Sequence, residues 1–400
     1  MAVGDVTRQS LWRVPGFVAT LVAVAAAFGS WSLLLPVVPL AVISSGGSDA
    51  LAGATTGVFM AATVVTQMFV PRALRLVGYT PVIVCAAVLL GIPAIVHAFT
   101  LAAVPLLLVS AIRGVGFGAL TVAESALIAE LVPARSLGKA SGALGLVVGL
   151  AELIFLPIGV YIAEHVGYTV VYWSAAVVAL LAAMMGLSIP RMKASPKMPV
   201  GAAVGAPTWK LVIIPALGIA TVAIGFGAIS TFLPAAIEQH SITDSALIAG
   251  VALSLVGGTQ MVSRYAAGVF ADRRGAPGKM MFPALMSSLI GMILIVATLT
   301  TTWSSWGFLL GAAFFGLGFG AVQNEALLLM FARMPREKIS EASAIWNMSF
   351  DSGTGVGSLA LGVVALSFAY QGVFAVGAAC IAAGAVAYVF DWFVGKLRGR

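Results

Sequence analysis

The sequence predicts an all-α integral membrane protein with twelve transmembrane helices in two six-helix bundles. Hydrophobic residues make up 61% of the 400 positions and charged residues only 9%, whereas an average soluble domain carries roughly 25% charged residues. Twelve spans of about 20 apolar residues need about 240 apolar positions, and 61% of 400 residues is about 244. The apolar runs do not alternate with polar residues, as the strands of a membrane β-barrel would. A water-soluble enzyme is therefore excluded.

Charged residues, glycines and prolines divide the apolar sequence into twelve expected spans. The first six are expected near residues 15–43, 51–70, 79–97, 101–132, 140–163 and 169–188. The second six are expected near residues 211–237, 246–271, 280–299, 306–332, 340–365 and 372–394.

The two halves of the sequence resemble each other. The run from Arg113 to Ala119 and the run from Phe315 to Ala321 both read Gly-x-Gly-Phe-Gly-Ala after their first residue, and the same shift of 202 positions pairs Pro133 with Pro335. A six-plus-six repeat is typical of parallel-repeat transporters, which bind their solute between the halves. The expected domains are a bundle at 1–189, a cytoplasmic linker at 190–209 and a bundle at 210–400.

Basic residues lie mainly in alternate loops. Most of the 21 Lys and Arg residues fall there, and the intervening loops carry acidic residues and the three histidines. This asymmetry is the positive-inside pattern. It predicts a multi-pass protein of the cytoplasmic membrane with both termini in the cytoplasm. The histidines, which we expect simply at the outer surface, are His97, His165 and His240.

Two motifs carry a resemblance to a known family. Gly268, Asp272, Arg273 and Gly275 follow the spacing Gly-x-x-x-Asp-Arg-x-Gly between the eighth and ninth spans, and Arg113 precedes closely spaced glycines on the fourth span. Both motifs resemble those of the major facilitator superfamily, in particular its proton-coupled drug or sugar exporters. The resemblance covers essentially the whole chain, and it implies a secondary transporter that works by alternating access.

The resemblance also implies a cytoplasmic gate. In the family the loop motif stabilises the outward-facing state, and Arg264 lies just before it. In the first-half copy, Pro71 stands at the glycine position and Arg75 at the aspartate position. The expected gate residues are Arg264, Gly268, Asp272, Arg273 and Gly275.

Ionisable residues inside the spans predict proton coupling. A charge in the middle of a membrane costs about 2.5–3.5 kcal/mol on insertion scales, so it usually faces the protein interior and has a function. Four carboxyl groups surround one cation, and some of them are expected to take up protons near neutral pH. The alternatives are a permanent ion pair between Arg113 and Glu152, or acids that only line an aqueous vestibule. The expected coupling residues are Arg113, Glu152, Asp351, Glu124 and Glu325.

Aromatic and amide residues near the middle of the spans are the candidates for solute binding, with ordinary packing as the alternative for each aromatic residue. Four acids against one arginine favour a cationic or neutral solute over a dianion. The expected binding residues are Trp31, Phe117, Phe226, Phe319, Gln323, Asn324, Trp346 and Asn347.

The sequence as a whole predicts proton-coupled efflux of a small organic solute by a monomeric transporter in contact with membrane lipid. A proton-coupled uptake symporter and a lipid or lysolipid flippase on the same fold are the alternatives. No phosphate-binding glycine loop, metal-ligand spacing or catalytic triad is present in the sequence. We therefore expect no enzymatic activity, no cofactor, no metal and no nucleic acid partner.

Overall fold

The computed structural model describes residues 11–194, 208–240, 245–301, 304 and 306–397. Those residues form helices and connecting turns, with no strand among them. Most of the expected linker at 190–209 lies outside the described residues. By its internal contacts the chain divides into two compact units. Unit 1 comprises Met1–Lys197 and Arg336–Ala344, and unit 2 comprises Met198–Pro335 and Ile345–Arg400.

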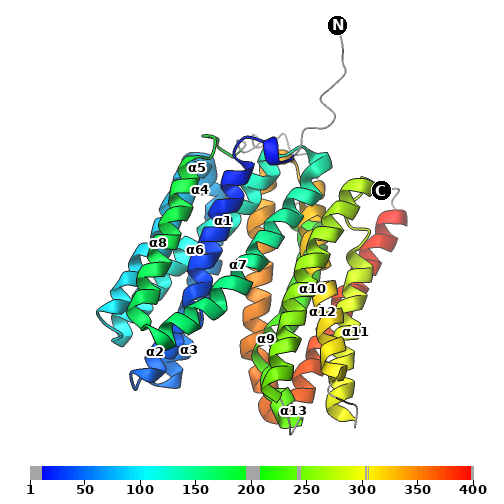
Figure 1. Cartoon of the computed structure of the whole chain (residues 1–400). Coiled ribbons are helices and arrows are strands. Elements are labelled where there is room, and N and C mark those ends of the chain that lie inside the picture. Colours follow the sequence, from blue (N-terminus) through cyan, green and yellow to red (C-terminus); the bar gives the residue numbers. More distant parts are fainter. Residues whose placement is uncertain (1–10, 195–207, 241–244, 302–303, 305, 398–400) are drawn as a thin grey trace. The chain divides into compact units, whose positions relative to one another are not determined.

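Unit 1 is built from eight α-helices and short 3-10 turns (Figure 1). The break between its first two helices coincides with Pro36, which has no N–H to donate within a helix. A 3-10 helix, η2, continues α5. The helices are α1 Phe17–Leu34, α2 Val37–Ser44, α3 Asp49–Gln67, α4 Val70–Leu76, α5 Tyr79–Gly91, η2 Ile92–Ala98, α6 Ala103–Leu131, α7 Leu137–His165 and α8 Tyr168–Leu187.

Unit 2 contains helices α9 to α12 and most of α13. The last one, α13, merges two helices across a kink at Ala369, whose φ of 54° lies in the left-handed region. Both of the expected last spans, 340–365 and 372–394, are therefore helical parts of α13. The helices are α9 Thr208–His240, α10 Ser245–Arg274, α11 Met281–Thr300, α12 Trp306–Arg333 and α13 Ile339–Leu397.

The described helices are long and apolar enough for a multi-pass membrane protein. Ten of them could cross a membrane by length and composition, or eleven if the bent pair Leu51–Gln67 and Val70–Leu76 counts as one span. The break between this pair is a bend of 50°. Each of the twelve expected spans falls on a helix, and the expected all-α membrane fold is confirmed.

The two glycine-rich helices occupy equivalent places in their units. Helix α6 packs against α3 and α5, and α12 packs against α10 and α11. A Cβ added at Gly116 would overlap the carbonyl of Ala86 on α5, and one added at Gly318 would overlap the carbonyl of Ala284 on α11. Glycine is needed at these positions because the neighbouring backbones approach so closely.

Candidate functional site

A cluster of aromatic rings lies inside unit 1. Trp31 of α1 stacks on Phe117 of α6, with 5.0 Å between the ring centroids. Phe28 and Phe59 pack against the same Phe117 ring at 5.3 and 5.5 Å. The structure thus brings together two expected binding residues, Trp31 and Phe117, and adds two that the sequence analysis missed. Phe28 lies one helical turn before Trp31, so helical spacing could have indicated it.

Arg113 is buried beside this cluster. Its side chain is only 4% exposed, its Nε donates to the Leu90 carbonyl at 3.0 Å, and its guanidinium carbon lies 5.7 Å from the centroid of the Phe59 ring. It lines a small cavity together with Trp31, Phe59 and Ser110. A buried guanidinium next to an aromatic ring is stabilised by a cation–π interaction, which contributes about 2 kcal/mol or more when both groups are desolvated.

His97 corrects one expectation. We expected this histidine at the surface, but it is 3% exposed, and neither ring nitrogen has a hydrogen-bond partner among the described residues. It lies on η2, which packs against α8, and its ring centroid is 5.5 Å from that of Tyr172. The expected span ends at residue 97 and η2 ends at Ala98, so the boundary agrees; the imidazole is buried because η2 packs against α8. His165, by contrast, is exposed.

Unit 2 contains a second aromatic cluster. Phe226 of α9 stacks on Phe319 of α12 with 4.7 Å between centroids. Phe315 and Phe350 stack on the same Phe319 ring at 5.5 and 5.9 Å, and Trp346 of α13 stacks on Phe350 at 5.7 Å. The expected residues Phe226, Phe319 and Trp346 are thus linked through Phe350, which the sequence analysis did not single out.

Arg264 lies in this second cluster. It is 6% exposed, its Nη1 donates to Gln323 Oε1 at 2.8 Å, and its guanidinium carbon lies 5.6 Å from the centroid of the Trp346 ring. The indole N–H of Trp346 donates to the Gln323 carbonyl at 3.0 Å. Arg264 thus contacts two expected binding residues, Gln323 and Trp346, and its expected role at the gate stays a prediction. Asn324 is fully buried, and neither atom of its amide group has a hydrogen-bond partner among the described residues.

The carboxyl groups have different surroundings. Glu124 on α6 is 1% exposed, and neither of its oxygens has a hydrogen-bond partner among the described residues. Glu152 on α7 and Asp351 on α13 are half-buried, and Asn347, one turn before Asp351, is buried. Glu325 is buried and accepts backbone hydrogen bonds from Gly278 at 2.6 Å and Met280 at 3.2 Å. Glu325 therefore also holds the loop between α10 and α11.

That loop contains the end of the Gly-x-x-x-Asp-Arg-x-Gly motif. Helix α10 ends at Arg274, and Gly275 follows with a φ of 58°, as glycines commonly do after a helix C-terminus. Asp272 and Arg273 lie in the last turn of the helix, and Gly268 lies about two turns before its end.

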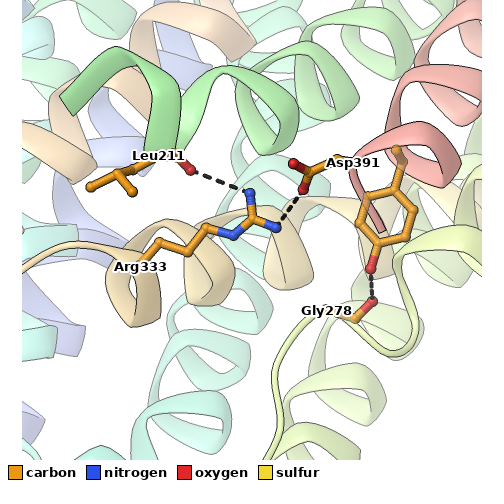
Figure 2. A network of polar contacts seen from close by, with 5 residues as sticks. Leu211, Gly278, Arg333 and Asp391 are labelled. Atoms are coloured by element: carbon orange, nitrogen blue, oxygen red, sulfur yellow. Dashed lines mark hydrogen bonds and ion pairs between the residues drawn. The ribbon is translucent and has the colours of Figure 1, made fainter. Parts of the chain in front are cut away.

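A polar network fastens the same end of unit 2. The Arg333 guanidinium lies between Leu211 and Asp391 (Figure 2), with Nη2 2.7 Å from an Asp391 carboxylate oxygen and Nη1 3.3 Å from the Leu211 carbonyl. The Tyr388 hydroxyl donates to the Gly278 carbonyl at 2.7 Å. These bonds join α9, α12, α13 and the loop after α10.

Unit 1 has an ion pair at the degraded copy of the motif. Arg75 of α4 lies 3.2 Å from Glu341, which belongs to the segment Arg336–Ala344 of the same unit. Ser343 in this segment donates to the Val122 carbonyl of α6 at 2.9 Å and is also hydrogen-bonded to Ser125. The arginine that stands at the motif's aspartate position thus has an acidic partner.

Comparisons with known proteins agree with this architecture. The sequence model of the Major Facilitator Superfamily matches residues 20–358. Two relatives, from two strains of Mycobacterium tuberculosis and both described as uncharacterized MFS-type transporters, are 26% identical over 188 residues, which is 45% of this chain and 26% of theirs. The match thus spans about a quarter of the length of these curated relatives.

Two solved structures share the fold. A major facilitator proton:xylose symporter bound to 6-bromo-6-deoxy-D-glucose superposes with a TM-score of 0.78 at 17% identity, covering 94% of this chain and 95% of that one. A bacterial homologue of the iron transporter ferroportin, in an outward-facing state, superposes with a TM-score of 0.76 at 14% identity, covering 94% and 98%. At these identities the likeness establishes the fold.

Proposed function

Because this chain belongs to the Major Facilitator Superfamily, whose members are transporters and not enzymes, we propose that it exports a small organic solute in exchange for protons. The fold supports secondary transport by alternating access. The exchange would take place across the cytoplasmic membrane, with both termini in the cytoplasm.

One observation carries this proposal: each unit holds a buried arginine within an aromatic cluster. Arg113 lies over the Phe59 ring in unit 1, and Arg264 lies over the Trp346 ring in unit 2. Aromatic faces give an organic solute apolar contact area, and a few polar groups fix its orientation. Two related units that each hold such a cluster suit a carrier built from two parallel repeats.

The acids supply the proposed route for protons. A buried carboxylate without a hydrogen-bond donor is costly, so we propose that Glu124 is in its neutral form in this structure. Glu152 and Asp351 would exchange protons during the cycle, with Arg113 as the cation that alternately attracts and releases a carboxylate. Each elementary charge that crosses 100 mV contributes about 2.3 kcal/mol, which is sufficient to drive export against a concentration gradient.

The proposed cytoplasmic gate consists of the loop motif and the Arg75–Glu341 pair. Gly268, Asp272, Arg273 and Gly275 would shape this gate on unit 2, and Glu325 keeps their loop in place through Gly278 and Met280.

Glu152→Gln tests the coupling. A ligand-stabilisation screen first identifies a solute, and purified protein in vesicles then carries it with and without an imposed pH gradient. We expect the variant to retain downhill exchange and to lose gradient-driven accumulation, because an amide cannot carry a proton through the cycle. Glu164→Gln, at an exposed acid on the same helix, is the matched control. Coupling that survives Glu152→Gln would remove Glu152 from the mechanism, and accumulation in the direction of proton flow would indicate uptake by symport.

A further inference from the structure

The cavity beside Arg113 contains hydrogen-bond donors that have no acceptor in the described part of the chain. The Nη1 and Nη2 atoms of Arg113 have no hydrogen-bond acceptor among the described residues, and no carboxylate of that part of the chain lies within ion-pair distance of them. Buried charges in proteins are normally paired. The site therefore carries a positive charge that only a carbonyl and an aromatic face compensate.

A second, independent feature of the cavity is an unused donor. The indole Nε1 of Trp31 is buried and has no acceptor among the described residues. The Ser110 and Thr55 hydroxyls, which also line the cavity, donate to the carbonyls of Leu106 and Ala52 on their own helices. The cavity walls thus offer unused N–H donors from Arg113 and Trp31. The hydroxyl groups in the walls already donate to backbone carbonyls.

These unused donors indicate which chemical group of a solute would bind in the cavity. Resting on the proposed transport function, we propose that Arg113 and Trp31 form a subsite for the carboxylate group of a solute with an aromatic or apolar body. A carboxylate accepts two parallel hydrogen bonds from a guanidinium, which is a strong and directional pairing. The Trp31, Phe59 and Phe117 rings lie next to the same site and would contact the body of the solute.

The size of the cavity fits a head group. The volume open to the centre of a water molecule is about 20 Å³, and one water needs about 10–15 Å³. The oxygens of a carboxylate fit this space, whereas the rest of the solute requires the cavity to open further during the cycle. The buried arginine of unit 2, Arg264, lies on α10 and already donates to Gln323, so the anionic group is assigned to unit 1.

This assignment changes the expected solute. The sequence count of four acids against one arginine favoured a cationic or neutral molecule. Glu124, the buried acid on the same helix, has no hydrogen-bond donor among the described residues, so this acid is not paired with Arg113.

Three probes with the same ring system test the subsite in binding assays on the purified full-length protein. They are 2-naphthoate, the neutral 2-naphthamide and the cationic 2-naphthylmethylamine, measured by thermal stabilisation and by quenching of tryptophan fluorescence. We expect saturable binding with naphthoate at least about tenfold tighter than the amide, since a hydrogen bond to a charged group contributes at least this factor. Arg113→Gln should remove the preference, and Arg113→Lys should retain a weaker one because lysine keeps the charge without the planar fork. Equal binding of the probes, a preference for the amine, or a preference that survives Arg113→Gln would overturn the proposal.

A charge insertion covers the case in which Arg113→Gln does not fold. Thr56 lines the same cavity, so the carboxylate of Thr56→Glu should pair with Arg113, raise the thermal midpoint relative to Thr56→Gln and abolish naphthoate binding. Naphthoate binding that is unchanged in Thr56→Glu would contradict the subsite. No proton movement enters these assays, so they can succeed even if the Glu152→Gln experiment shows that coupling was assigned wrongly.

Discussion

Glu325 and Glu124 are both buried acids on equivalent glycine-rich helices, yet their surroundings differ. Glu325 accepts two backbone hydrogen bonds from the loop after α10, while Glu124 has no donor among the described residues. Sequence spacing marked both as intramembrane acids and could not separate them, because the donors on Gly278 and Met280 belong to a loop almost fifty residues earlier in the chain.

Substitution separates the two acids. Glu325→Ala leaves the buried N–H of Gly278 and the partly buried N–H of Met280 without an acceptor. An unsatisfied buried N–H costs about 1–3 kcal/mol, so we expect a clearly lower thermal midpoint. Glu124→Gln replaces an acid that we propose is neutral by an amide of the same shape, so it should shift the midpoint little. Thermal unfolding of the purified proteins measures both, and equal effects of the two substitutions would contradict the different roles given to them.

The aromatic clusters show what sequence reasoning can find at the residue scale. Trp31, Phe117, Phe226, Phe319 and Trp346 were predicted from their positions near the middle of the spans, and the structure places each of them in a ring cluster. The partner rings on other helices were not predictable, because ring contacts depend on how the helices rotate against one another. The roles of all these residues in binding remain predictions.

At the scale of helices, glycine determines how closely α6 and α12 approach their neighbours. Gly114 and Gly118 face α3, and Gly116 faces α5. Gly316 and Gly320 face α10 in the same way. The repeat in the sequence thus corresponds to a repeated packing arrangement of the helices. The same glycine spacing therefore occurs in both halves of the sequence.

Alanine substitutions test this packing. Gly116→Ala and Gly318→Ala place a Cβ against a backbone carbonyl that cannot rotate away, so we expect destabilisation of about 1–3 kcal/mol, as for other overpacked sites. Gly258→Ala is the matched control, since nothing lies within 4 Å of its Cβ position, and alanine is the better helix former by about 1 kcal/mol. Thermal midpoints that fall equally for all three variants would refute the close-approach role.

The helix boundaries were less predictable than the helices themselves. Pro36 and the bend between α3 and α4 divide expected spans into shorter helices. In the opposite sense, α13 joins two expected spans across Ala369. The buried position of His97 was missed because it depends on the packing of η2 against α8, which the sequence does not show.

At the scale of the whole molecule, one segment from the second half of the sequence belongs to unit 1. Arg336–Ala344 is held there by the Arg75–Glu341 pair and by hydrogen bonds of Ser343. An ion pair that is partly exposed contributes only about 0.2–1 kcal/mol. An ion pair of this strength can break and re-form repeatedly. We expect the Arg75–Glu341 pair to control how often the segment Arg336–Ala344 becomes accessible to solvent.

Charge reversal tests whether the Arg75–Glu341 ion pair holds this segment. In a variant without the native cysteines, Ser343→Cys reports on the segment, because Ser343 is fully buried. Arg75→Glu places two acids opposite each other and should make the cysteine react faster with a thiol reagent. Combining Arg75→Glu with Glu341→Arg should restore the slow rate. If labelling is unchanged by the single reversal, the pair does not hold the segment.

The most direct test of the whole account is solute transport in sealed vesicles that contain only this protein and carry an imposed pH gradient. We predict that the solute accumulates against its own gradient in the compartment from which protons leave, and that collapsing the pH gradient releases it. Simple equilibration of the solute, at a rate that does not respond to the pH gradient, would contradict proton exchange as the driving force.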